Sequence, residues 1–172
     1  MAGTISSFLS DDHKRLDALL RKAVSQPGRL DAGAYAAFRA GLLKHIGMEE
    51  KILLPAVQQL RGGEPPPMAA KLRLDHGALA ALLVPSPTPG IVAALRAILD
   101  LHNALEEGPG GLYELCDSLA GGEAGELLDR LRAAPEVSVA PHNDGPGVLE
   151  ATRRALQRAG YDLDELASRA AP

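Results

Sequence analysis

The chain has 172 residues, 46% of them hydrophobic and 23% charged, which fits one globular domain with a core and a short appendage. A formal net charge of −4 without a lysine and arginine cluster argues against nucleic acid or an anionic membrane surface as partners. Cys116 is the single cysteine, which excludes an internal disulfide and a CxxC site. Without a signal peptide or a membrane-length apolar run, we expect a cytoplasmic protein whose metal sites, if any, use histidine and carboxylates.

Four long helices are predicted in chain order, because alanine and leucine abound and the apolar pattern is helical. After the four long helices, short helices are predicted near residues 112–119 and 123–133. The predicted fold class is an all-α, up-and-down four-helix bundle. The long helices are expected from Thr4 or Ser10 to Ser25, from the N-cap Asp31 to about Leu60, from Pro65–Pro67 in a first turn to Val84, and from the cap Thr88 to just beyond Glu106.

The C-terminal part is predicted to be an extension of this bundle. Residues 135–147 have the composition of a loop, and residues 148–159 form a short amphipathic helix followed by a further turn at Leu163 and Leu166. We therefore expect domains at 1–134 and 135–172. The extension could cover the bundle, or bind a protein partner or a second copy, and His142 could reach the site as an additional ligand.

Each long helix carries one histidine within an apolar seam whose steps alternate between three and four residues. This pattern predicts that all four histidines face the core. The seams are Leu9, His13, Leu16 and Leu20; Phe38, Leu42, His45, Glu49, Ile52 and Ala56; Leu72, His76, Leu79 and Leu83; and Leu95, Leu99, His102 and Glu106.

Two of these histidines are followed by glutamate at position i+4, which places an imidazole and a carboxylate on one helix face. A lone buried histidine is commonly a packing residue, but a carboxylate on an apolar seam needs a cation. The predicted metal ligands are His13, His45, Glu49, His76, His102 and Glu106. His13 and His45 lie at similar distances from the first turn and should be at one level.

Six ligands are too many for one tetrahedral zinc ion and fit two metal ions better. Imidazole with carboxylate suits iron, with zinc and manganese as competitors. Glu49 and Glu106 could each bridge two iron ions, leaving positions for O2, NO or peroxide. Glu50 and Glu107 follow these ligands by one position, about 100° around the helix, and are expected to face solvent.

Two tyrosines are open to more than one interpretation. Tyr35 and Tyr113 could donate a hydrogen bond near the site or simply pack in the core or an interface. Pro55 is expected to kink the second helix beyond the ligands.

The sequence resembles the hemerythrin-like, or HHE cation-binding, family over about residues 4–120. The resemblance is carried by Asp12-His13, the run from His45 to Pro55, Asp75-His76, and the run from His102 to Glu107. Oxygen-carrying members have a further histidine at the position of Leu72 and a final aspartate at i+5. The present set is more similar to the di-iron members linked to nitrosative stress and iron-sulfur cluster repair.

Three functions follow as expectations. The first is non-heme di-iron binding of O2, NO or peroxide for sensing or stress protection. The second is an enzyme with peroxidase-like activity or iron delivery for iron-sulfur cluster repair. The third is a metal-stabilised module whose extension binds a partner. Reversible ligand binding without turnover would favour the first function, and multiple turnovers of a substrate would favour the second. Pulldown of a partner that depends on the extension, with an inert metal, would favour the third.

Overall fold

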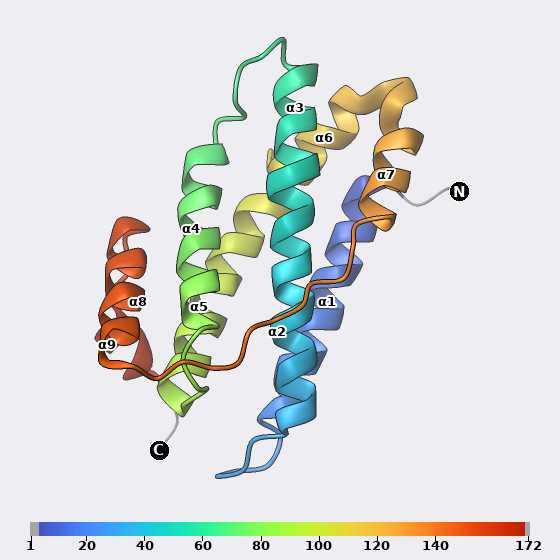
Figure 1. The fold of residues 1–172 in the computed structure, drawn as a ribbon. Helices are drawn as coiled ribbons and strands as arrows, with labels where there is room; N and C mark the ends of the chain where they lie inside the picture. The colour runs from blue at the N-terminus through green and yellow to red at the C-terminus, as the bar shows by residue number, and fades with distance from the viewer. Residues whose placement is uncertain (1–3, 171–172) are drawn as a thin grey trace. The chain divides into compact units, whose positions relative to one another are not determined.

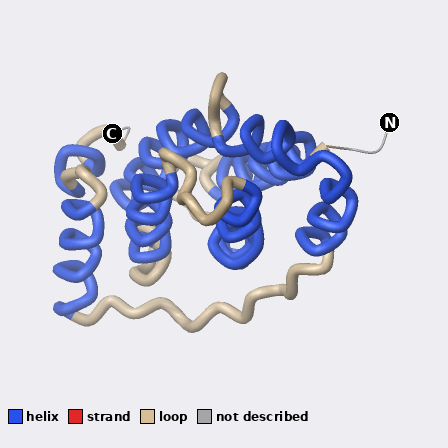
Figure 2. The backbone as a smooth tube through the Cα atoms, turned by 90° about the horizontal axis from the view of Figure 1, so that it is seen from above, coloured by secondary structure: helices blue, strands red, loops and turns tan. Residues whose placement is uncertain are grey.

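A computed structural model of the chain describes residues 4–170, and every regular element within this range is a helix (Figures 1 and 2). The all-α prediction is confirmed, whereas the up-and-down order of one bundle stays a prediction. The elements are α1 Ile5–Ala23, α2 Ala32–Met48, the π-helix η1 Glu49–Leu53, α3 Leu54–Leu60, α4 Ala69–Leu82, α5 Pro89–Glu107, α6 Leu112–Ala120, the 3-10 helix η2 Gly121–Glu123, α7 Ala124–Arg132, α8 Pro146–Arg158 and α9 Leu163–Ala167.

The helices belong to two compact units. The first unit combines the N-terminal part up to Pro66 with Glu106–Val139, and the second combines Pro67–Leu105 with the C-terminal part from Ala140. Among the helices of residues 4–170, none is both long and apolar enough to cross a lipid bilayer.

In the first unit, α1 packs against α2, α6 and α7, and α3 packs against α6. Of the two starts predicted for the first helix, Thr4 is the observed one, and its side chain accepts a hydrogen bond from the Ser7 amide. The predicted cap Asp31 accepts one from the Ala34 amide. Gly28 allows the turn between α1 and α2 because its φ is +72°. The core of this unit includes the predicted seam residues Leu9, Leu16, Leu20, Phe38 and Leu42.

The second predicted helix is interrupted by a π-turn at Glu49–Leu53 and continues as α3. Pro55 lacks an amide hydrogen and cannot donate to the carbonyl four residues earlier, while the Leu54 amide donates to the Glu49 carbonyl five residues earlier. The additional residue in this turn shifts the apolar seam by one position. Leu53 and Val57 are buried, and the prediction that Ile52 and Ala56 lie on the seam is wrong.

In the second unit, α4 packs against α8, and α8 packs against α9. Thr88 caps α5 by accepting a hydrogen bond from the Ile91 amide, as predicted. The prolines at 65–67 precede α4 and are not in its first turn, because this helix begins at Ala69. The Thr152 hydroxyl donates to the Ala81 carbonyl, so the C-terminal segment is attached to α4 within this unit.

Candidate metal centre

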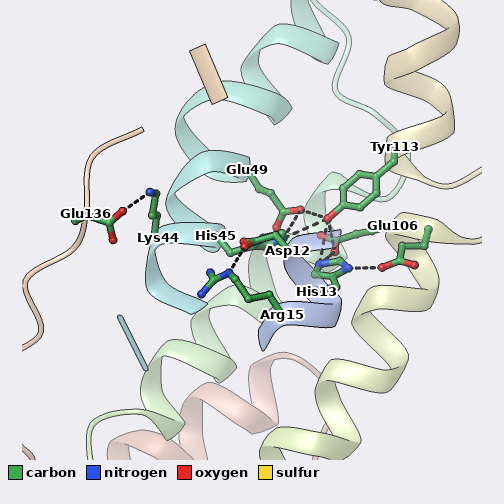
Figure 3. Close-up of polar contacts among 10 residues, drawn as sticks. Asp12, His13, Arg15, Lys44, His45, Glu49, Glu106, Tyr113 and Glu136 are labelled. Carbon is green, nitrogen blue, oxygen red and sulfur yellow. Dashed lines mark hydrogen bonds and ion pairs between the residues drawn. The ribbon is translucent and has the colours of Figure 1, made fainter. Parts of the chain in front are cut away.

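Four of the six predicted ligands come together in the first unit (Figure 3). His13 is presented by α1, His45 by α2, Glu49 by the first residue of the π-turn, and Glu106 by the last turn of α5. Each offers one donor atom, and these four atoms all lie within 4.8 Å of one another. The side chains are 8%, 2%, 0% and 0% exposed, respectively, so two imidazoles and two carboxylates share a buried space.

Two close contacts define this cluster. His13 Nε2 lies 3.3 Å from Glu106 Oε2, and His45 Nε2 lies 3.3 Å from Glu49 Oε1. The two imidazole rings have centroids 4.5 Å apart, which confirms that His13 and His45 lie at one level. Two ring nitrogens and two carboxylate oxygens at these separations fit a divalent or trivalent transition metal, with iron, zinc and manganese all compatible with this donor set.

Outer carboxylates orient both imidazoles. His45 Nδ1 lies 2.8 Å from Asp12 Oδ2, and His13 Nδ1 is hydrogen-bonded to Glu107 Oε1. Arg15 in turn donates from Nε to Asp12 Oδ1 over 2.8 Å. A carboxylate behind the ring directs the Nε2 atom toward the cluster, as is common for metal-binding histidines. Glu107 is exposed, as predicted, and it contacts His13 from a different helix.

The pKa values of His45 and Asp12 show that a metal ion would displace a proton from the cluster. Burial by itself would lower the pKa of His45, but the charge of Glu49 and hydrogen bonds with Asp12 and Glu49 raise it to about 10. Burial by itself would raise the pKa of Asp12, but hydrogen bonds with His45 and Arg15 lower it to about 2. Without metal, therefore, His45 holds a proton that a metal ion must displace, and acid weakens metal binding.

Tyr113 is a further residue of the cluster. After α5 the chain turns at Gly110, whose φ is +73°, and α6 packs against α1. The Tyr113 side chain is 1% exposed, and burial together with the charges of Glu49 and Glu106 raises its pKa well above the ordinary value. Its phenolic oxygen lies 2.6 Å from Glu49 Oε1, 3.1 Å from His13 Nε2, 3.2 Å from Glu106 Oε2 and 3.3 Å from His45 Nε2 (Figure 3).

The second unit holds the other two predicted ligands, which are both 3% exposed. The rings of His76 on α4 and His102 on α5 have centroids 4.8 Å apart. His102 Nδ1 lies 3.3 Å from Asp75 Oδ2, which repeats the arrangement of a carboxylate behind an imidazole. Lys71 Nζ donates to Asp75 Oδ1 over 2.6 Å and to the Ala159 carbonyl over 2.7 Å, so this pair is linked to the C-terminal segment.

The outer shell gives a prediction with a neighbouring control. Asp12→Asn should lower the affinity for metal by about 10- to 100-fold, because the amide holds the His45 ring less firmly and does not favour its metal-binding form. Asp11 forms an exposed ion pair with Lys14, so Asp11→Asn should leave the affinity unchanged. Competition with a chromophoric chelator measures both affinities. Equal affinities for the two variants would show that Asp12 does not support the site.

Comparison with known proteins agrees with the resemblance seen in the sequence. Residues 4–85 match the family model described as the hemerythrin HHE cation binding domain. The matched range includes His13, His45, Glu49 and His76. No curated protein and no solved structure gives a significant match. The resemblance to the hemerythrin HHE cation-binding domain family is thus confirmed over residues 4–85.

Proposed function

We propose that the chain is a non-heme di-iron protein that binds O2, NO or peroxide for sensing or stress protection. The observation that carries this proposal is the buried set of two imidazoles and two carboxylates in the first unit, with donor atoms within 4.8 Å of one another. Buried carboxylates are stabilised by a cation, and the HHE cation-binding family match supports the same conclusion. A cytoplasmic setting is part of this proposal.

The proposed ligand set is the six residues predicted from the sequence. His13 and His45 would bind one ion, and His76 and His102 would bind the other. Glu49 and Glu106 each have two carboxylate oxygens and would bridge the ions. The paired imidazoles within each unit support this division, since their ring centroids are 4.5 Å and 4.8 Å apart. Six donors are too many for one closed tetrahedral zinc ion, and iron is proposed because imidazole together with carboxylate suits it.

The bound metal would supply a redox-active centre with positions open to a small ligand. The protein's own residues bind and orient it. Asp12, Glu107 and Asp75 fix the three imidazoles whose Nδ1 atoms they contact. The position of Leu72, where oxygen carriers have a further histidine, is a fully buried leucine and offers no ligand atom. An additional open position suits reaction or sensing better than oxygen storage.

Metal content tests the proposal directly. The full chain reconstituted anaerobically with ferrous iron and freed of excess metal should retain about two iron ions per chain, counted by elemental analysis. One firmly held zinc ion per chain that iron does not replace would contradict the di-iron assignment. The His13→Ala variant serves as a control, since it should lose at least one of the two ions.

Optical spectra recorded while the reduced protein is mixed with O2, NO or hydrogen peroxide then separate the two main functions. Spectral changes that reverse when the ligand is removed support binding or sensing. Repeated consumption of peroxide by a small amount of protein would instead identify a peroxidase-like enzyme, the alternative expected from the sequence.

A further inference from the structure

Tyr113 makes more close contacts than hydrogen bonding can explain. Its phenolic oxygen has one proton to donate and can accept two hydrogen bonds, which allows three partners. The structure places four donor atoms between 2.6 and 3.3 Å from it. Two of them are carboxylate oxygens, which accept only, and a single phenol proton serves one of them at a time.

The two imidazoles point ring nitrogens at the same oxygen. The carboxylates of Asp12 and Glu107 accept hydrogen bonds from the Nδ1 atoms of His45 and His13, so Nε2 is the nitrogen of each ring that remains to bind a metal ion once the ion displaces its proton. Possible metal-binding atoms from five side chains therefore converge on one buried point. Such convergence is typical of ligands arranged around a cation.

The distances agree with that arrangement. Bonds from a metal ion to nitrogen or oxygen are about 2.1 Å long, so neighbouring ligands of an octahedron lie about 3 Å apart and opposite ones about 4.2 Å apart. The Tyr113 oxygen has neighbour distances to all four donor atoms, and the His13–Glu106 and His45–Glu49 contacts of 3.3 Å are of the same kind. These six separations are therefore those expected between neighbouring corners of an octahedron, with the phenolic oxygen adjacent to each of the other four atoms.

We propose that Tyr113 is a metal ligand, binding through its phenolate oxygen the ion that His13, His45, Glu49 and Glu106 hold. This inference rests on the proposed function, because it requires metal at that position. On binding, the bond from the phenolic oxygen to its proton is replaced by a bond to the metal, and the proton passes to solvent. A third anionic oxygen favours ferric over ferrous iron, and one coordination position of this ion remains for a small ligand.

Vibrational spectroscopy tests the inference on the full chain loaded with iron and oxidised. A phenolate bound to ferric iron gives a visible charge-transfer band, and excitation in this band should enhance tyrosine ring vibrations in the resonance Raman spectrum. Tyr113→Phe should abolish the band and lower the ferric iron affinity about tenfold or more. Tyr35→Phe removes another buried tyrosine of the same unit, and Tyr161→Phe the third tyrosine, so both should keep the band.

The outcomes separate the two proposals. Iron-loaded protein without tyrosine vibrations, or with vibrations that Tyr113→Phe leaves in place, would overturn the role of Tyr113 and leave iron binding intact. A wild-type chain that retains no iron would overturn the proposed function instead. If Tyr113→Phe does not fold, a shift of the enhanced vibrations in wild-type protein made with ring-deuterated tyrosine still decides whether a tyrosine binds the iron.

Discussion

Glu49→Ala should remove both iron ions from the reconstituted protein, with a loss of affinity of at least about 100-fold for each. The Glu49 carboxylate is fully buried, lies 3.3 Å from His45 Nε2 and 2.6 Å from the phenolic oxygen of Tyr113, and is proposed to bridge the two ions. A bridging ligand contributes to both sites, so its loss should cost more than the loss of an outer carboxylate. Elemental analysis and chelator competition measure the effect.

Glu50→Ala is the matched control for this variant. Glu50 has the same chemistry one position later in the π-turn, where its side chain is only half-buried and lies outside the cluster of donor atoms. This variant should retain about two iron ions. Retention of iron by Glu49→Ala together with its loss from Glu50→Ala would mean that the other face of the helix binds the metal.

Removal of the metal should lower the melting temperature of the protein by about 8–16 °C. A ligand that binds only the folded state at about 1,000 times its dissociation constant stabilises that state by about 4 kcal/mol. For a chain of this size each kcal/mol corresponds to about 2–4 °C. The physical source is the buried pair of carboxylates at Glu49 and Glu106, whose charges the cations neutralise.

Calorimetry of the iron-loaded and chelator-treated protein measures this difference. The Glu49→Ala variant should melt at one temperature whether or not iron is added, because it does not bind the metal. Equal melting of loaded and metal-free wild-type protein would show that the metal does not stabilise the fold.

The faces of the helices could be predicted from the sequence because burial follows the helical repeat. The predicted seam residues around His13 and His76 are buried, as are Phe38 and Leu42 before His45, and all four histidines face a core. The level of His13 and His45 followed from the rise per residue of an α-helix and the position of one tight turn. The caps Asp31 and Thr88 could also be predicted, because each side chain accepts a hydrogen bond from the backbone amide three residues later.

Features that depend on contacts between segments could not be predicted in the same way. Tyr113 follows Glu106 by seven residues, but a glycine turn separates the two, and no repeat indicates where α6 returns. The helical repeat correctly places Glu107 at the surface, but it describes a single helix and does not indicate the partner, His13 on α1. The limits 1–134 and 135–172 for two domains stay a prediction.

The π-turn at Glu49–Leu53 adds one residue between two α-helical segments and so shifts the phase of the second segment relative to the first. As a result, the possible ligands up to Glu49 are buried, and so are Leu53 and Val57 beyond it. Because the π-turn contains one residue more than an α-helical turn, it can lose one residue and become regular α-helix. Deleting Ile52 would convert the segment to regular α-helix and bring Leu53 and Val57 back into phase with the residues before Glu49, whereas a deletion within α2 would turn His45 away from the centre.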